Sequence, residues 1–272
     1  MRWRSTSSTS IRTEMAVVYI LAHFDDEYCG LPLVTAGVRA GEDQRFFYVA
    51  DYASAELAER RYAESRALLA HLGVDPAHVL HVGQGTGALD GGVHRALPAA
   101  YEALRQAIAE VGAVEKIVVT AYEGGHMDHD MCALMAAKLA AAHGHPPIET
   151  ISLYNGPRLG GPFFHGASPL PENGPVRRIR LSFGEWFAWM LAVRFFPSQT
   201  KTWLGLWPAM FFTYAKRGFG VQRLDPARIG QRPHAGVLFY ERMFKVPYAE
   251  VRAAADAFLG PRLALHDHQE AE

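Results

Sequence analysis

The sequence has little cysteine, little net charge and no long hydrophobic run, and each absence argues against a class of protein. Two cysteines among 272 residues cannot form a disulfide framework, so we expect a reducing compartment. The net charge of −1 lacks the basic excess typical of nucleic-acid binding. No run reaches the roughly 18 apolar residues of a membrane-spanning helix. We therefore predict a cytoplasmic protein without a nucleic-acid partner.

The first 14 residues are rich in Ser, Thr and Arg and lack the apolar stretch of a secretory signal. We predict a disordered leader over residues 1–14, and Met15 is an alternative start. The hydrophobic fraction of 49 % is sufficient for a substantial core. We expect that core in residues 15–155. Residues 156–272 are expected to elaborate the same domain and to complete its substrate pocket.

Strand and helix patterns alternate regularly through residues 16–155. Residues 16–22 form a continuous apolar run, which is typical of a strand buried on both faces. Further strands are expected at 45–51, 78–82, 116–121 and 148–154, with helices in the intervals, including one over 131–142. This alternation predicts an α/β fold: a Rossmann-like three-layer sandwich with a mainly parallel sheet. Open sheets of this kind place their ligands beyond the carboxyl ends of the strands.

The pattern changes after residue 156. Gly and Pro cluster up to Pro175, which indicates irregular chain, and residues 183–219 contain four of the five tryptophans. We interpret this aromatic segment first as core or as an interface between two copies of the chain. A wall for an apolar or acyl-bearing substrate is the second interpretation, and an interfacial helix on a membrane is the third. Residues 236–242 (GVLFYER) read as a late strand, followed by a final helix.

Two polar clusters stand directly after expected strands. The first is His23-Phe24-Asp25-Asp26-Glu27 and the second is His126-Met127-Asp128-His129-Asp130. Because both follow parallel strands, the fold brings them to one crevice. Two histidines and a carboxylate suit a catalytic zinc ion, which keeps a fourth position for water. A second carboxylate can take a proton from that water, and a further histidine can stabilise an oxyanion.

The two clusters resemble the motifs A-H-P-D-D-E and H-P-D-H of the LmbE-like, or PIG-L, family of zinc-dependent N-deacetylases. The resemblance implies that His23, Asp26 and His129 bind Zn²⁺, with Fe²⁺ as the alternative ion. It implies that Asp25 is the general base, that His126 is the acid and oxyanion stabiliser, and that Asp128 tunes His126. The implied reaction is hydrolysis of an N-acyl group, acetyl above all, from an amino sugar or glycoconjugate.

Weaker matches accompany these motifs. Arg61 with Glu64, Leu89-Asp90-Gly91 and Ser198-Gln199 resemble an R-x-x-E helix, a D-G turn and a late S-Q pair of the family. Phe24 and Met127 stand where the family has proline, and Phe24 is expected to form an aromatic wall near the metal. Arg61 and His234 are the other expected substrate contacts, although Arg61 could instead pair with Glu64.

Several alternatives stay open at this point. His23-x-Asp25 with a distant histidine also matches an iron-binding triad of two histidines and a carboxylate, against which the βαβ alternation argues. The protein could also be an amidase for a longer acyl chain, or a binding protein that kept the fold and lost turnover. Cys29 and Cys132 are interpreted as small buried residues and not as ligands.

Overall fold

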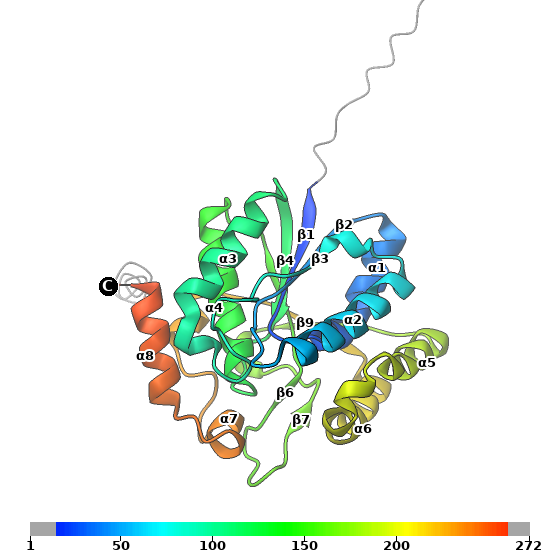
Figure 1. Ribbon diagram of the computed structural model, residues 1–272. Coiled ribbons are helices and arrows are strands. Elements are labelled where there is room, and N and C mark those ends of the chain that lie inside the picture. Colours follow the sequence, from blue (N-terminus) through cyan, green and yellow to red (C-terminus); the bar gives the residue numbers. More distant parts are fainter. Residues whose placement is uncertain (1–14, 261–272) are drawn as a thin grey trace, which may run out of the picture.

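The computed structural model describes residues 15–260 and contains a seven-stranded central sheet (Figure 1). The strand order is β3-β2-β1-β4-β5-β9-β8. The first five, which are parallel, are β1 (Ala16–Leu21), β2 (Asp43–Tyr48), β3 (Val79–His81), β4 (Val114–Thr120) and β5 (Ile148–Ile151). Two antiparallel strands, β8 (Val176–Ile179) and β9 (Phe219–Arg223), extend the sheet beyond β5. The predicted α/β fold with a mainly parallel sheet is confirmed.

Helices cover both faces of the sheet (Figure 1). One face packs against α3 (Leu97–Ala109), α4 (Met127–Ala142) and α8 (Tyr248–Leu259). The other packs against α1 (Leu31–Ala40), α2 (Ala55–Leu72), α5 (Phe183–Ala192) and α6 (Thr200–Arg217). Along β1, Val18 and Ile20 belong to the first core and Val17, Tyr19 and Leu21 to the second. This alternation explains why β1 is apolar at every position.

Several short elements lie around the carboxyl ends of the parallel strands. They are a 3₁₀ turn, η1 (Asp26–Gly30), the two-stranded β6 (Tyr154–Asn155) and β7 (His165–Gly166), and α7 (Phe239–Met243). In Figure 1, β1 enters at the top, and β6, β7 and α7 lie at the opposite edge of the sheet. This edge is the one where the two polar clusters were expected.

The predicted late strand over residues 236–242 is wrong, because its second half forms α7. The backbone N–H of Leu238 donates to the Glu241 carboxylate at 2.8 Å, which caps the first turn of this helix. Strands β8 and β9 were missed. Strand β8 (VRRI) has exposed arginines at its centre, so it shows no buried apolar run.

Helix α4 begins at Met127, four residues before the expected start at residue 131. His126 is its N-cap, and its first turn contains Asp128, His129 and Asp130, all of them buried. Polar residues in that turn conceal the hydrophobic periodicity on which the expected boundary depended. The helix therefore presents functional side chains directly from its first turn. Cys29 and Cys132 are buried, as predicted.

Candidate active site

Three potential metal ligands from the two loops meet at the carboxyl ends of β1 and β4. The donor atoms of His23, Asp26 and His129 lie within 4.8 Å of one another. Asp26 Oδ1 is 3.1 Å from His129 Nε2, and Asp26 Oδ2 is 3.8 Å from His23 Nδ1. These are the three residues that the family resemblance implied as ligands.

The Asp26 carboxylate is held in a fixed orientation. Its Oδ2 accepts hydrogen bonds from the backbone N–H groups of Ala22 and His23, both at 2.9 Å. Burial opposes ionisation of this carboxyl, but the adjacent His129 and His23 outweigh that effect and lower the pKa of Asp26 to about 2. Asp26 is therefore an ionised carboxylate at neutral pH.

The donor set fits a catalytic metal ion. Two imidazoles and one carboxylate are a ligand set found at catalytic zinc sites, which keep a further position free for water or substrate. All three side chains also line a cavity of about 210 Å³, so the site is accessible from that cavity. A zinc ion, or another divalent ion with similar preferences, could be held here.

Asp25 lies beside the ligands in a strained conformation. Its φ of 116° and ψ of −13° are rare for a non-glycine residue and cost on the order of 1–3 kcal/mol. The side chain is buried and lines the cavity. Burial, together with the neighbouring Asp26 and Glu27, raises the pKa of Asp25 well above its usual range. A carboxyl with a raised pKa is suited to accept a proton during a reaction.

His126 faces the same cavity from the start of α4. Its Nδ1 accepts a hydrogen bond from the backbone N–H of Asp128 at 3.2 Å. Burial, assisted by the nearby His23 and His129, lowers the pKa of His126 to about 3, so the ring is neutral at pH 7. With Nδ1 as acceptor, the neutral ring carries its proton on Nε2 and can donate from there.

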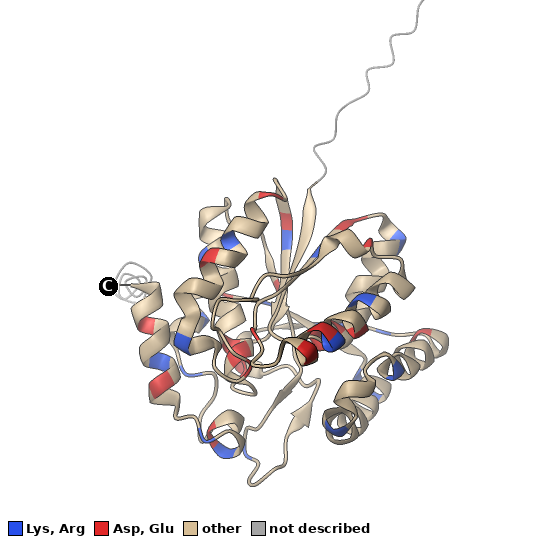
Figure 2. Cartoon of the chain, viewed as in Figure 1, with Lys and Arg blue, Asp and Glu red and all other residues tan. Residues whose placement is uncertain are grey.

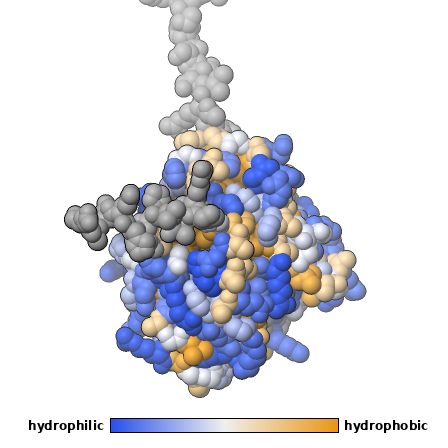
Figure 3. All heavy atoms as spheres, turned by 90° about the vertical axis from the view of Figure 1, so that its left-hand side faces the viewer, coloured by the Kyte–Doolittle hydropathy of each residue, from blue (hydrophilic) through white to orange (hydrophobic). Residues whose placement is uncertain are grey.

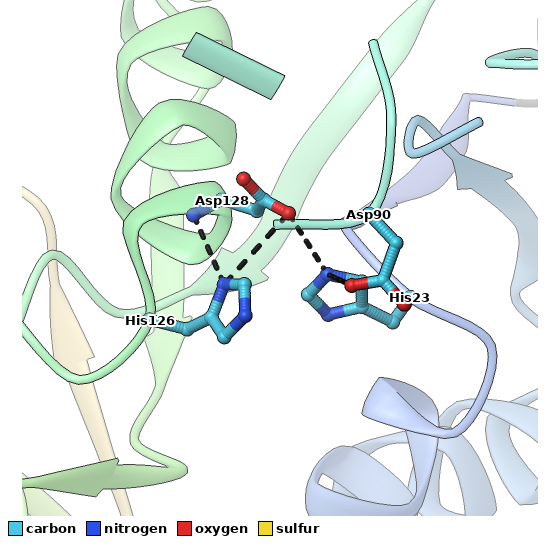
Figure 4. Close-up of side chains that lie close together, drawn as sticks. All are labelled: His23, Asp90, His126 and Asp128. Atoms are coloured by element: carbon cyan, nitrogen blue, oxygen red, sulfur yellow. Dashed lines mark hydrogen bonds and ion pairs between the residues drawn. The ribbon is translucent and has the colours of Figure 1, made fainter. Parts of the chain in front are cut away.

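Asp128 is fully buried and contacts two histidines (Figure 4). Its Oδ2 lies 3.1 Å from His23 Nε2 and 3.8 Å from His126 Nδ1. The backbone N–H groups of Gly91 and Val93 donate to this carboxylate at 2.7 and 3.0 Å. The shorter imidazole contact is thus to the proposed ligand His23, whereas the sequence had pointed to His126. Such a carboxylate behind a ligating histidine fixes its ring orientation.

Asp90 is a site residue to which sequence reasoning gave no role. Its Oδ1 lies 3.3 Å from His23 Nε2, as Figure 4 shows, and its Oδ2 lies 3.4 Å from Arg61 Nη1. Burial opposes protonation of His23, but Asp90 and Asp128 outweigh that effect and raise the pKa of His23 well above its usual range. The Asp90-Gly91 turn was visible in the sequence, but nothing in it indicated a contact with His23.

Arg61 lines the cavity, as expected of a substrate contact. The alternative pairing with Glu64 does not occur, because Glu64 accepts hydrogen bonds from the backbone N–H and the hydroxyl of Ser198 at 3.0 and 2.6 Å. Ser198 therefore links the segment before α6 to α2. Gln199 also donates to the Phe24 carbonyl at 2.6 Å.

Two expected substrate contacts lie elsewhere. Phe24 is fully buried, and its ring stacks on Tyr52 at a centroid distance of 5.2 Å. The rings of Tyr48 and His81 also contact it, each at a centroid distance of 4.8 Å. Its apolar ring is stabilised among these aromatic side chains and does not line the cavity. His234 is also buried outside the cavity lining, with Nδ1 2.8 Å from the Ala235 carbonyl.

The cavity has an apolar side, of which the sequence indicated only the part from the aromatic segment. It is contributed by β5–β6 and by elements far along the chain, and comprises Leu153, Tyr154, Trp203, Leu206 and Phe244. Trp203 and Leu206 belong to the aromatic segment, for which a substrate wall was one interpretation. The order of elements in space, and not a local pattern, brings these residues to the site.

The fold and this site define an α/β protein with a Rossmann-type sheet and a candidate metal centre at its carboxyl edge. Residues 18–140 match the family model described as PIG-L: GlcNAc-PI de-N-acetylase. This part of the chain is therefore similar to the PIG-L, or LmbE-like, family, as the motifs had indicated. No curated protein matches the chain.

Solved structures of deacetylases share the fold. The zinc-inhibited form of teicoplanin deacetylase Orf2 has a TM-score of 0.56 and 16 % identity, covering 78 % of this chain and 98 % of that one. The A40926 pseudoaglycone deacetylase Dbv21 has a TM-score of 0.55 and 16 % identity, covering 78 % and 96 %. At such identities the likeness establishes a common fold.

Proposed function

We propose that this protein is a metal-dependent hydrolase that removes an N-acetyl group from an amino-sugar substrate. The observation that carries the proposal is the convergence of His23, Asp26 and His129 beside Asp25 and His126 in one cavity. The match of residues 18–140 to the PIG-L family model, and the teicoplanin and A40926 deacetylases that share the fold, support the same reaction.

Each polar group has a place in amide hydrolysis. A zinc ion bound by His23, Asp26 and His129 would supply Lewis-acid polarisation of the acyl carbonyl and lower the pKa of a water molecule. Asp25 takes the proton from the attacking water and passes it to the departing amine. This replaces His126 as the acid that the resemblance implied, because the His126 ring, with its pKa lowered to about 3, is neutral at pH 7. His126 donates from Nε2 to the oxygen on which negative charge develops. Asp128 holds the His23 ring in place.

The cavity favours a small polar substrate group. Its volume of about 210 Å³ is below the roughly 300–1,000 Å³ of sites for drug-sized ligands, and suits a single sugar ring with its acetamido group. Arg61 and Asp90 lie on its rim, where a guanidinium and a carboxylate can bind sugar hydroxyl groups. Larger parts of the substrate would extend outside.

The test is acetate release from a panel of N-acetylglucosamine conjugates, measured together with the metal content of the purified protein. We expect about one metal ion per chain and acetate release that a chelator abolishes and added zinc restores. Release that continues in chelated protein shown to be metal-free would contradict the proposal. Unchanged release by an Asp25→Asn variant would contradict the assigned base.

A longer acyl group is the second candidate, favoured by the apolar side of the cavity formed by Trp203, Leu206 and Phe244. Comparing N-acetyl with N-octanoyl glucosamine distinguishes the two. A higher kcat/KM for the octanoyl amide would assign this side to the acyl chain, and a preference for acetyl would remove the candidate.

A further inference from the structure

The segment that carries α5 and α6 differs in charge from the rest of the molecule (Figure 2). Residues 176–217 contain seven Lys or Arg residues and one acidic residue, Glu185. The whole chain has 27 basic and 28 acidic residues, so the remainder has 20 and 27. A strongly basic segment thus lies within a protein whose net charge is near zero.

Most of these cations are not neutralised by a neighbour. Arg177 pairs with Glu149 at 2.6 Å, and Glu185 pairs with Arg39 at 2.8 Å. The other six have no ion-pair partner among residues 15–260, namely Arg178, Arg180, Arg194, Lys201, Lys216 and Arg217. They are therefore available to an anionic partner.

The same two helices expose large apolar side chains at regular spacing. On α5 the exposed series is Phe183, Phe187 and Leu191, with fractional exposures of 77, 44 and 41 %. On α6, Leu204 and Phe212 are 73 and 68 % exposed. A spacing of four or eight residues places each series along one side of its helix. Single exposed apolar residues are common, but two such rows on adjacent helices are not.

These rows are not the core-facing sides of the helices. Trp189 of α5 and Trp203, Met210 and Tyr214 of α6 are buried in the core cluster that includes α1 and α2. Each helix is therefore apolar on two sides, one packed on the domain and one facing outward. An outward apolar side requires a second apolar environment if it is to be covered.

Grooves accompany the exposed rows. One groove of about 600 Å³ lies along the start of α6, lined by Val193, Pro197, Trp203, Leu204 and Trp207. Trp203 also lines the catalytic cavity, so the two spaces share a wall. A second groove of about 380 Å³, between α1 and α5, has Arg39, Arg180 and Arg194 among its lining residues. The side of the molecule that carries α3 and α8 shows mainly hydrophilic residues with smaller apolar patches between them, where the chain is coloured (Figure 3).

We propose that α5 and α6 form a docking surface for a membrane that contains anionic lipids. Exposed Phe and Leu side chains would enter the interfacial region, and the flanking cations would contact lipid headgroups. No helix of residues 15–260 is long and apolar enough to cross a bilayer, so these helices would lie along the surface. Docking of this kind does not depend on the proposed hydrolysis.

The charge distribution favours a membrane over a second copy of the chain. In a two-fold dimer formed through this surface, the same surface of both subunits meets, so the interface would gather the unpaired cations of both. Like charges placed opposite one another across an interface oppose association. An anionic lipid surface instead complements both the cations and the exposed rows.

The experiment is flotation of the full-length protein with vesicles of phosphatidylcholine alone and of phosphatidylcholine with phosphatidylglycerol. We expect stronger binding to the anionic vesicles and weakening of that binding as salt is raised. A Leu204→Ser/Phe212→Ser double variant should lower the partition coefficient at least tenfold. A Lys201→Gln/Lys216→Gln variant should lower it about fivefold for each charge on anionic vesicles only.

Met15→Ser is the control, since Met15 is 51 % exposed directly before β1, outside α5 and α6, and this variant should bind as the wild type does. Circular dichroism establishes that each variant is folded. Absence of flotation with both vesicle types would overturn the proposal, as would an equal loss in the Met15 control. Sedimentation of the lipid-free protein as a dimer that Leu204→Ser/Phe212→Ser dissociates would also overturn it, by assigning the surface to a second copy.

Discussion

The loops after β1 and β4 and the α5–α6 pair use side chains in opposite ways. In the loops, polar groups such as Asp26 and Asp128 are buried, and each is held by two backbone N–H groups. On α5 and α6, apolar groups such as Phe183 and Phe212 are exposed. Buried polar groups are costly unless hydrogen-bonded, and exposed apolar rows are unfavourable in water. The buried polar groups in the loops therefore favour a chemical role, and the exposed apolar groups on α5 and α6 favour a role in binding.

The largest effect on activity is expected from removing a proposed metal ligand in the loops after β1 and β4. His129→Ala should lower the metal content to near zero and abolish acetate release, because two remaining ligands bind zinc poorly. The measurements are metal analysis and acetate release on the same preparation. His143→Ala, at the C-cap of the same helix, should behave as wild type. Full metal content in the His129 variant would remove that residue from the ligand set.

Asp25→Asn should retain the metal but lower kcat by about 10²–10⁴, the usual contribution of a general base. Asp26→Asn, one residue later, should instead lose the metal. The same two measurements distinguish the neighbouring carboxylates. Equal loss of metal in both variants would show that Asp25 acts as a ligand or through folding.

Two phenylalanines test the contrast between buried and exposed aromatic residues. Phe24→Ala should lower the free energy of unfolding by about 3–5 kcal/mol, as for other fully buried phenylalanines. Phe212→Ala, with the side chain 68 % exposed, should change it by about 0.5 kcal/mol or less. Urea unfolding measures both. A large loss at Phe212 would mean that α6 is covered within the folded protein.

The smallest effect is expected at the rim of the cavity. Arg61→Ala should raise KM about tenfold with little change in kcat, because a hydrogen bond from a charged group is worth about 1.5–3 kcal/mol. Arg60→Ala is the matched control, since Arg60 is exposed on the same helix and pairs with Glu56. A fall in kcat without a change in KM would assign Arg61 to the chemical step.

The sequence predicted the parallel half of the sheet well, because β1 is apolar throughout, β2 and β4 contain apolar runs, and helices end at glycines such as Gly41 and Gly73. It predicted less after residue 156. Strands β8 and β9 are short and partly polar, and they exist because β5 offers them an unpaired edge. Similarly, the α7 segment reads as a strand locally, but Glu241 caps it as a helix.

Within the site, the sequence by itself determined which residues are available: both polar clusters follow strands of one parallel sheet, so they must meet at one edge. Only the tertiary structure decided how they are paired. The packing of the chain buries the Phe24 ring among other aromatic side chains, places Asp90 next to His23, and adds Trp203 of α6 to the cavity lining. The reason is that local patterns fix which element a residue occupies, whereas contacts between distant segments depend on the packing of the whole chain.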